Sequence, residues 1–386
     1  MIKKIINCFR YPYFGTSLSN WFSLIIANKG VDLNRIPLAL FITIGLFLLA
    51  PFRLAASIGR RSAIKSASLS EPPIFIIGHW RSGTTHLHYL MSASGRFGGI
   101  HSFDAFYPFF SLWIRDEKSL LNRMLKRLSW KRHQDNVNVG VDCPAEEEFA
   151  VAHTSPYSFF HGWVFKKHYQ EYLNQFLLLE GISENVLAQW KKAYNDILLQ
   201  SNVCSSGKRL LLKNPYNTSK MKMLLSMYPG AKFIYIYRNP YKVYASTMNM
   251  YKKTDYIALQ RISGSETQEN VLAAYKSLLE RFYEEVEEIP EGCCSFIKYE
   301  DLVENPLEEM ARVYKDIGLD GFETDSKGMI EYLKSVKDYT ANTFRLGEEE
   351  CRIIEQEWGE YIRLMGYEAE HSHKHKVFNL DRTPES

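Results

Sequence analysis

The chain has 386 residues, of which 46% are hydrophobic and 14% aromatic, and its formal net charge is +3. This composition is typical of a folded globular protein and excludes a disordered chain, while the length suits one large domain with an appendage. A charge so close to zero argues against a nucleic-acid-binding domain, so we expect no nucleic-acid partner.

The first 70 residues are predicted to form an apolar helical leader. Its core, residues 36–52, has 17 residues without a charge, which is near the lower limit for spanning a bilayer. Three interpretations stay open, namely a helix or hairpin packed on the rest of the protein, a helix lying in a membrane interface, and a full span. Membrane-surface contact would involve residues 1–60, and an anionic surface would suit the flanking cations Lys3, Lys4, Arg10, Arg53, Arg60, Arg61 and Lys65.

Strands and helices are predicted to alternate after a connector at residues 59–71 and the helix-stopping pair Pro72-Pro73. Short apolar runs predict buried strands at residues 74–77, 209–213, 232–237 and 294–298. The helices are expected at 84–94, 221–227, after Pro240, and at 268–288, 306–317 and 348–365, with a mostly helical insert at 105–200. This alternation predicts a parallel sheet with its functional site at the carboxyl ends of the strands.

The first strand runs into a glycine-containing turn, residues 78–85, and then into a helix. Such a turn directs backbone N–H groups and a helix N-terminus at one point, which suits a phosphate or a sulfate. Gly78 and Gly83 have the spacing of a nucleotide-binding P-loop, but Thr84 stands where a triphosphatase needs lysine, and Arg81 lies inside the turn. We therefore predict an α/β fold with a P-loop-type parallel sheet flanked by helices, in a catalytic domain at 71–370 followed by a polar tail at 371–386.

The segment PIFIIGHWRSGTTHLHYL resembles the phosphosulfate loop of sulfotransferases that use 3′-phosphoadenosine 5′-phosphosulfate (PAPS). It is most similar to the Arg-Ser-Gly-Thr-Thr group, which includes bacterial and tyrosylprotein enzymes. The resemblance implies that PAPS is the co-substrate, that no metal is required, and that the donor contacts Arg81, Ser82, Gly83, Thr84 and Thr85.

A second match lies after the strand KFIYIY, where Arg238 is followed eight residues later by Ser246. An arginine at a strand end with a serine on the next helix resembles the family's 3′-phosphate site. Arginine offers a planar fork of donors to a phosphate, whereas a triphosphatase would favour an aspartate for Mg²⁺ near such a strand end.

Two further segments resemble the family. Lys213, at the end of the strand in RLLLKNPYNT, corresponds to a lysine near the transferred group, and Tyr299 begins a Tyr-Glu-Asp-Leu segment that is expected to contact the donor. Many relatives have histidine at the position of Asn217, so no base is expected there. Arg81 and Lys213 would stabilise the charge that develops on the leaving phosphate.

A general base must take the proton of the acceptor hydroxyl. The segment DCPAEEEFA resembles an Asp-x-Pro-x-Glu-Glu-Glu-Phe-Ala segment of this group, and we rank Glu147 first and Glu146 second as the base. First-turn glutamates also complement a helix dipole, and neighbours on a helix point about 100° apart, so only one or two of them are expected to face the cleft. His101 and Asp104 are alternatives, and His79 is expected to shape the loop.

The acceptor is expected to be a hydroxyl on a small molecule or a lipid. The aromatic residues of the insert and the apolar leader favour a lipophilic alcohol such as a sterol or a glycolipid. Six scattered cysteines without a Cys-x-x-Cys pair indicate reduced, mostly buried thiols and a cytoplasmic catalytic domain, attached to the inner face of a membrane if the leader binds lipid.

Two other classes of protein compete with this interpretation. A P-loop small-molecule kinase or nucleotide triphosphatase is disfavoured by Thr84 and by Arg238, which replace the lysine and the acid of that class. A membrane-associated binding protein with an inactive loop is disfavoured because Arg81, Ser82 and Ser246 are all present.

Overall fold

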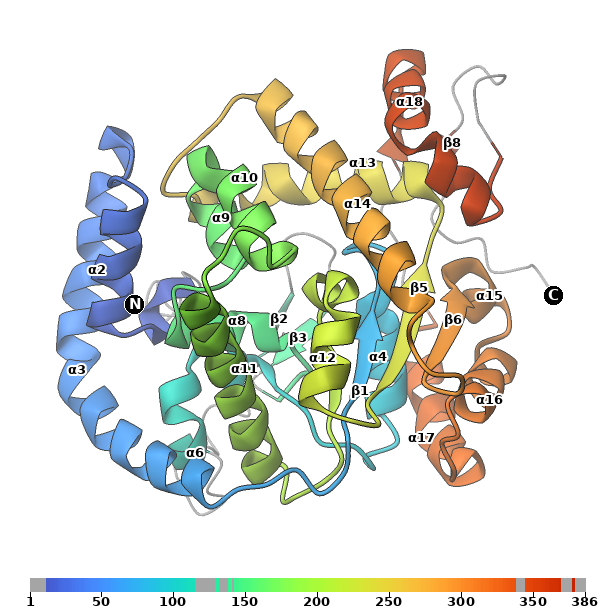
Figure 1. The fold of residues 1–386 in the computed structure, drawn as a ribbon, viewed down its shortest axis with the longest axis horizontal. Coiled ribbons are helices and arrows are strands. Elements are labelled where there is room, and N and C mark those ends of the chain that lie inside the picture. The colour runs from blue at the N-terminus through green and yellow to red at the C-terminus, as the bar shows by residue number, and fades with distance from the viewer. Residues whose placement is uncertain are drawn as a thin grey trace.

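The computed structural model describes residues 12–114, 129–131, 138–140, 142–337, 344–368 and 377–378. Lys3, Lys4, Arg10 and most of the tail at 371–386 lie outside these ranges. In Figure 1 a small sheet lies among helices, and the N-terminal helices wrap one side of the molecule.

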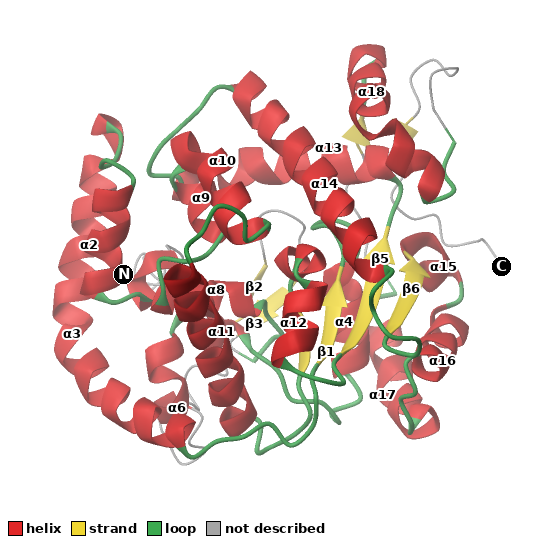
Figure 2. Ribbon diagram, in the orientation of Figure 1, coloured by secondary structure: helices red, strands yellow, loops and turns green. Residues whose placement is uncertain are grey.

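Four parallel strands form the central sheet in the order β4–β1–β5–β6, and the bounds are Leu211–Lys213, Ile74–Ile77, Lys232–Tyr237 and Cys294–Lys298 (Figure 2). The predicted parallel sheet is therefore confirmed. All four residues of β1 are buried, as its run of β-branched and aromatic residues predicts. Because β1 has later strands on both sides, the strand order reverses there, and the carboxyl end of β1 opens into the crevice where α/β proteins bind ligands.

Helices cover both faces of the sheet. Phe75 and Phe233 face one core, together with Leu278 of α14, whereas Ile76 and Ile234 face a second core. The helices that follow or cover the strands are α4 Thr84–Ser92, η6 Pro215–Ser219, α12 Met221–Met227, α13 Pro240–Thr254, η7 Asp255–Ile257, α14 Gly264–Val286, α15 Tyr299–Glu304, α16 Pro306–Asp316, α17 Phe322–Ser335 and α18 Glu348–Leu364.

The insert between α4 and β4 is mostly helical in its described part, as predicted. It also contains a short antiparallel pair, β2 Ser129–Lys131 and β3 Asn138–Gly140, which its sequence did not predict. Its helices are α5 Ser102–Phe106, η3 Pro108–Phe110, α6 Ser111–Ile114, α8 Glu147–Thr154, α9 Phe160–Val164, η4 Lys166–His168, α10 Tyr169–Tyr172, η5 Leu173–Leu177 and α11 Glu184–Cys204.

The leader is a helical hairpin held against the insert. It comprises η1 Pro12–Gly15, α2 Leu18–Ala27, η2 Leu33–Arg35 and α3 Ile36–Lys65. The expected connector at 59–71 is wrong in its first half, because α3 continues to Lys65 and only residues 66–73 connect it to the sheet. The α3 helix contains Pro51 and curves around the domain in Figure 1, which agrees with the bend that an internal proline causes.

Three further features differ from the expectations. Helix α17 was not predicted, and β7 Phe344–Arg345 pairs with β8 Val377–Phe378, so part of the expected polar tail is paired. Of the six cysteines, the five that the structure describes are half-buried, not buried as expected. Within the described residues, no group of three or more His, Cys, Asp or Glu side chains is placed to hold a metal ion.

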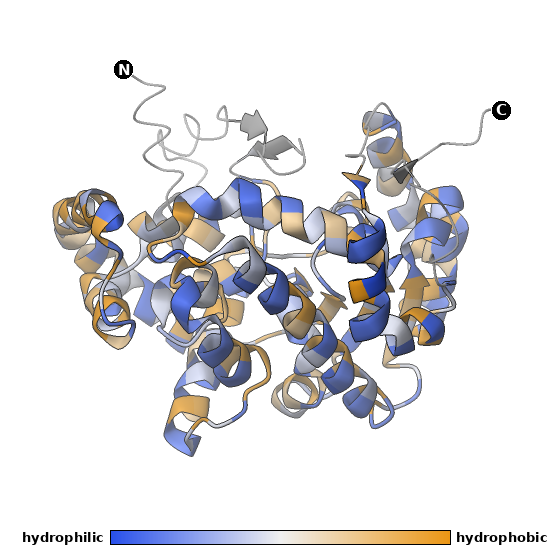
Figure 3. Ribbon diagram, turned by 90° about the horizontal axis from the view of Figure 1, so that it is seen from above, coloured by the Kyte–Doolittle hydropathy of each residue, from blue (hydrophilic) through white to orange (hydrophobic). Residues whose placement is uncertain are grey.

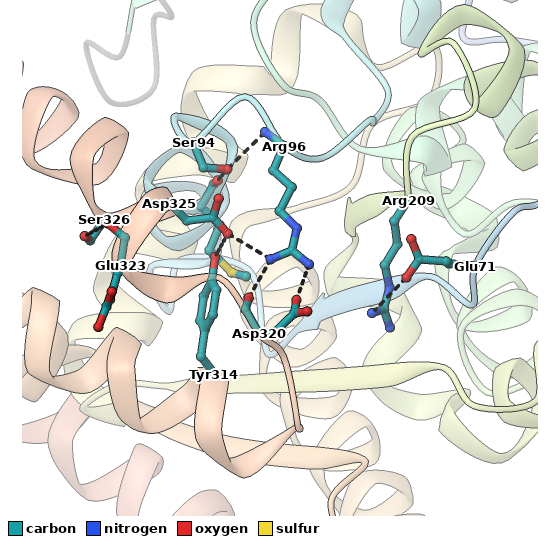
Figure 4. Close-up of polar contacts among 10 residues, drawn as sticks. Glu71, Ser94, Arg96, Arg209, Tyr314, Asp320, Glu323, Asp325 and Ser326 are labelled. Carbon is teal, nitrogen blue, oxygen red and sulfur yellow. Dashed lines mark hydrogen bonds and ion pairs between the residues drawn. The ribbon is translucent and has the colours of Figure 1, made fainter.

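Polar contacts join the segment after α4 to α17 at the end of the sheet opposite the crevice (Figure 4). Arg96 donates to the Asp320 carboxylate at 2.5 Å and to Asp325 at 3.3 Å, and Tyr314 also donates to Asp325 at 3.0 Å. Nearby, Arg209 lies 3.6 Å from Glu71. The contacts of Arg96 and Tyr314 position α17, and they explain how a helix without a sequence motif is fixed to the domain.

Candidate active site

The loop between β1 and α4 is shaped by backbone conformations that few residues adopt. Gly78 and Gly83 have φ of 134° and 96°, and Arg81 has φ of 73°, which is uncommon for a residue with a Cβ. A Cβ on Gly83 would lie 2.1 Å from the Tyr299 ring, so only glycine fits there. The Gly78 N–H donates to the Thr218 hydroxyl at 2.7 Å, which fixes the start of the turn.

Helix α4 begins directly after this loop, with Gly83 as its N-cap residue. The first N–H groups of a helix have no partner inside the helix and carry a partial positive charge. The backbone N–H groups of Thr84 and Thr85 lie at this helix start, which suits an anion, whereas the Ser82 N–H donates to the His79 carbonyl at 3.1 Å inside the loop.

Arg81 reaches from the loop to α13. Its Nε donates to the Ser246 hydroxyl at 2.8 Å, which joins the predicted 5′-phosphosulfate loop to the predicted 3′-phosphate site. Two segments 165 residues apart in the chain therefore meet at one end of the sheet.

Arg238 follows the last residue of β5 and is buried. Its guanidinium lies over the Tyr299 ring at 3.9 Å from the ring centre, a cation–π contact that holds the side chain in place. The Nε atom of Arg238 is buried without a hydrogen-bond partner among the described residues. A buried guanidinium donor without a partner is costly, and a bound phosphate would satisfy it.

Lys213, the last residue of β4, forms an ion pair with Glu146 at the entrance to α8. The lysine side chain is 3% exposed and the glutamate 19%. The Lys213 ammonium also lies 3.5 Å from the Thr85 hydroxyl in the first turn of α4. Lys213, Glu146 and the anion-binding loop are therefore adjacent.

Comparison with known proteins identifies this arrangement. The sulfotransferase family model matches residues 72–324. Over 371 residues the chain is 31% identical to the omega-hydroxy-beta-dihydromenaquinone-9 sulfotransferase Stf3 of Mycobacterium bovis and of Mycobacterium tuberculosis, and the match covers 92% of this chain and 91% of the relative.

The chain belongs to the sulfotransferase family. The family resemblance inferred from the loop is thereby confirmed, and the protein is an enzyme that transfers a group.

Two solved sulfotransferases share the fold. STF1 from Mycobacterium tuberculosis has a TM-score of 0.61 at 20% identity, covering 82% of this chain and 85% of that one. STF9 from Mycobacterium avium has a TM-score of 0.61 at 16% identity, covering 92% of this chain and 98% of that one. These similarities support the α/β architecture of this sulfotransferase and its helical N-terminal region.

Glu146 and Glu147 of this sulfotransferase lie in different environments. Glu147 begins α8 and is completely buried, where it accepts hydrogen bonds from the Tyr194 hydroxyl and the Asn217 amide, both at 2.7 Å. Burial raises the pKa of Glu147 to about 7, against the opposing effect of the Tyr194 hydrogen bond. Asn217 stands where many relatives are expected to have histidine. In this chain its side-chain amide is a hydrogen-bond donor to Glu147.

The other candidate bases lie beside this pair. His101 is the N-cap residue of α5, and its Nδ1 lies 3.6 Å from the carboxylate of Asp104. Burial, followed by the charges of Lys213 and His101, lowers the pKa of His88 well below its usual range, so His88 is neutral and lies near both of these side chains. His79 packs on Trp80, and burial lowers its pKa to about 3, which agrees with a role in shaping the loop.

Some polar residues of the site were not singled out as functional from the sequence. Asn214 donates to Glu148 at 3.1 Å, and Ser158 also donates to Glu148 at 2.5 Å. Tyr194 and Thr218 support Glu147 and the loop, respectively. The signals for the asparagines were their segment RLLLKNPYNT, which resembles the family, and its place after a strand, where ligand-binding residues collect.

We expect the Glu147 carboxyl to make the free energy of unfolding fall as the pH rises. Its pKa is raised to about 7 by burial, so the folded protein keeps a proton that the unfolded chain releases near its ordinary value of 4.5. This stabilisation is complete below the unfolded pKa and is lost as the pH rises through about 7, with a total of about 3 kcal/mol.

Urea unfolding of the wild type and of Glu147→Gln at about pH 5 and about pH 8 measures this effect. The variant should gain stability relative to the wild type at the higher pH. Buried histidines with a lowered pKa, such as His79 and His161, make the protein less stable in acid. Because both proteins contain them, their contribution cancels in the difference between wild type and variant. A difference between the two proteins that does not change with pH would contradict the expectation.

Proposed function

We propose that this sulfotransferase transfers a sulfuryl group from PAPS to the hydroxyl of a lipophilic alcohol. The observation that carries the proposal is the pairing of two anion sites at the carboxyl ends of the strands. Arg81 belongs to the loop that suits the 5′-phosphosulfate, and its hydrogen bond to Ser246 leads directly to the second site, where Arg238 has a buried, unpartnered Nε. A donor with phosphates at both the 5′ and 3′ positions matches two such sites.

In this proposal the side chains act by positioning the donor and the acceptor and by stabilising the charge of the leaving group. The N–H groups of the loop and α4, together with Arg81 and Lys213, stabilise the negative charge that develops on the leaving 5′-phosphate. The acceptor oxygen forms a bond to sulfur as the bond from sulfur to the phosphate oxygen breaks, and the products are the sulfate ester and 3′,5′-adenosine bisphosphate. The acceptor proton passes to a carboxylate of the protein.

We propose Glu146 as that carboxylate, although the sequence ranked Glu147 first. Glu146 is partly exposed and contacts Lys213, which in turn lies 3.5 Å from Thr85 of the loop helix. Glu147 is buried and already accepts hydrogen bonds from Tyr194 and Asn217. A base must approach the acceptor hydroxyl, so the more accessible carboxylate beside the loop is favoured.

The proposed acceptor is a long-chain lipid with a terminal hydroxyl. The relatives with 31% identity are named for an omega-hydroxylated menaquinone, which is such a lipid. In this chain Trp80 of the loop packs on Phe159, Trp163 and Tyr216, with ring centres 6.1, 5.8 and 5.7 Å away, so the loop is backed by a mostly buried aromatic cluster. Sterols and glycolipids remain alternative acceptors of the same lipophilic class.

The test is transfer of label from ³⁵S-PAPS by the full chain to acceptors in mixed micelles. We expect labelling of an omega-hydroxylated polyprenyl quinone and none of the same quinone without the hydroxyl. Sterols, glycolipids, phenols and soluble sugars complete the panel. Labelling of soluble sugars alone would overturn the acceptor class, and no transfer from PAPS to any hydroxyl would overturn the proposed donor.

A further inference from the structure

The leader exposes an apolar face that the rest of the described surface does not match. Of the 18 exposed large hydrophobic side chains, 12 lie between Phe22 and Ile58, and we call these 12 the leader face. Ile26, Leu48 and Leu54 are 76%, 70% and 70% exposed. Figure 3 shows hydrophobic residues gathered along the α2–α3 hairpin at the left edge. Soluble monomers rarely leave so much contiguous apolar surface uncovered.

The opposite side of the hairpin is firmly packed on the protein. Ile42 and Leu46 of α3 are buried, and the Trp21 indole donates to Thr43 at 2.9 Å, which ties α2 to α3. Gly45 lies so close to Phe14 that a Cβ would come within 2.2 Å of its ring. On the leader face, Leu40, Ile44 and Leu48 repeat every four residues, so this part of α3 is apolar on both sides, with one side in the core and the other uncovered.

This packing argues against a span, although α3 with η2 is long and apolar enough to cross a membrane. A span would remove Ile42 and Leu46 from the core. It would also place the Arg53 guanidinium, now buried beside Phe14 and Phe109, in hydrocarbon. The charge-free run at 36–52 rises only about 26 Å as a helix, which is less than the thickness of a bilayer core.

The charge of the leader indicates what covers the face. Residues 1–70 contain nine Lys and Arg but one acid, Asp32, so their net charge is +8. The whole chain has +3, and the remaining residues therefore sum to −5. Lys29 beyond one end of α2 and Arg61 and Lys65 at the end of α3 are exposed, so cations flank the apolar stripe. A second copy would bring this positive face against itself, whereas an anionic lipid surface attracts it.

We infer that the leader face docks in the interface of an anionic bilayer, with α2 and α3 lying along the membrane plane. The docked hairpin is close to the active site through α8. Thr16 and Asn20 of the leader donate to the carbonyls of His153 and Ala152 at the carboxyl end of α8, and Glu147 begins that helix. Eight residues of helix span about 12 Å, so Glu146, the proposed base and the N-cap residue of α8, lies one short helix away from the docked hairpin.

Docking would let this enzyme meet a hydroxyl of a lipid that stays in the membrane. The docking itself does not depend on the proposed acceptor, because it follows from the exposed apolar residues and the cations alone. If no sulfuryl transfer were found, the proposed membrane docking would therefore be unaffected. If no docking were found, the proposed donor site would be unaffected.

The test is flotation of the full chain with vesicles of phosphatidylcholine, with and without phosphatidylglycerol. We expect binding to the anionic vesicles, and a decrease of at least about 10-fold for the double variant Ile44→Glu with Leu48→Glu. Leu364→Glu changes a residue of similar exposure on α18 and should bind vesicles like the wild type. Replacing Arg61 and Lys65 by glutamine should weaken binding to anionic vesicles by about fivefold for each cation.

Thermal unfolding and the affinity for 3′,5′-adenosine bisphosphate should be the same in all these variants, which shows that the domain is folded. The inference would be overturned if the wild type did not bind anionic vesicles, or if the double variant bound them as well as the wild type does. A wild-type dimer that becomes a monomer in the double variant without any vesicle binding would also overturn it, since a second copy would then cover the face. Bound protein should exchange onto a second vesicle population, and protein that never leaves the first would indicate a span.

Discussion

Replacing Glu146 by glutamine is expected to lower kcat by about 10²- to 10⁴-fold, the usual contribution of a general base. The amide keeps the shape of the side chain but cannot take the acceptor proton. Lys213 and the loop are not altered by this change, so the affinity for 3′,5′-adenosine bisphosphate should be unchanged or slightly stronger. Single-turnover transfer from labelled PAPS, with calorimetric titration of the bisphosphate, separates the two effects.

Glu147→Gln is the matched control because it makes the same chemical change one residue away. Its carboxylate is enclosed by Tyr194 and Asn217, so we expect a loss of kcat of less than about tenfold. Thermal unfolding must accompany both measurements, because Glu146→Gln removes the counter-charge of Lys213, whose side chain is 3% exposed. If Glu147→Gln lost more activity than Glu146→Gln, the order proposed for the two carboxylates would be reversed.

Replacing Arg238 by alanine is expected to weaken 3′,5′-adenosine bisphosphate binding by about 100-fold or more, because a charge-assisted contact to a buried phosphate is lost. The affinity for 5′-AMP, which lacks the 3′-phosphate, should change little. This difference between the two ligands assigns Arg238 to the 3′-phosphate independently of any effect on folding.

Two variants sharpen the Arg238 measurement. Arg238→Lys keeps the charge but loses the planar fork that lies over Tyr299, so it should recover only part of the affinity. Arg209→Ala removes an arginine beside Glu71 at the opposite end of the sheet (Figure 4) and should bind the bisphosphate normally. An equal loss for the bisphosphate and for 5′-AMP in Arg238→Ala would contradict the assignment.

The sheet and the anion-binding loop could be predicted because their signals are local. A buried strand, a turn with Gly78 and Gly83 and a following helix occupy about 20 consecutive residues, and parallel strands bring their carboxyl ends together. The pairing of Arg238 with Ser246 came from the family resemblance, while the parallel strand ends predicted that this pair lies at the same edge as Arg81. The 2.8 Å contact between Arg81 and Ser246 agrees with that placement.

The roles of the glutamates could not be derived in the same way. Which of Glu146 and Glu147 turns toward the loop depends on where α8 begins, and a shift of one residue rotates the side chain by about 100°. The structure begins α8 at Glu147 and leaves Glu146 in extended backbone beside Lys213. That start is fixed by contacts with Tyr194 and Asn217, which are distant in sequence.

The sequence alone also could not decide how the leader is placed relative to the protein and to a membrane. A charge-free run of 17 residues fits a buried helix, an interfacial helix and a short span equally well. The hydrogen bond from Arg60 to Gln200 and the contact of Arg53 with the Phe109 ring place one side of α3 on the insert. Helix α17 was not predicted because tertiary contacts, such as that of Arg96 with Asp320, fix it in place. The β7–β8 pair was not predicted because each strand has only two residues.

The central claim is that this site holds a nucleotide with phosphates at both the 5′ and 3′ positions. Calorimetric titration of the full chain with 3′,5′-adenosine bisphosphate, 5′-AMP and ATP with Mg²⁺ tests it most directly. The account predicts that the bisphosphate binds about 100-fold more tightly than 5′-AMP, because Arg238 and Ser246 contact the 3′-phosphate. Binding of ATP with Mg²⁺ more tightly than the bisphosphate, or equal affinities for the bisphosphate and 5′-AMP, would contradict it.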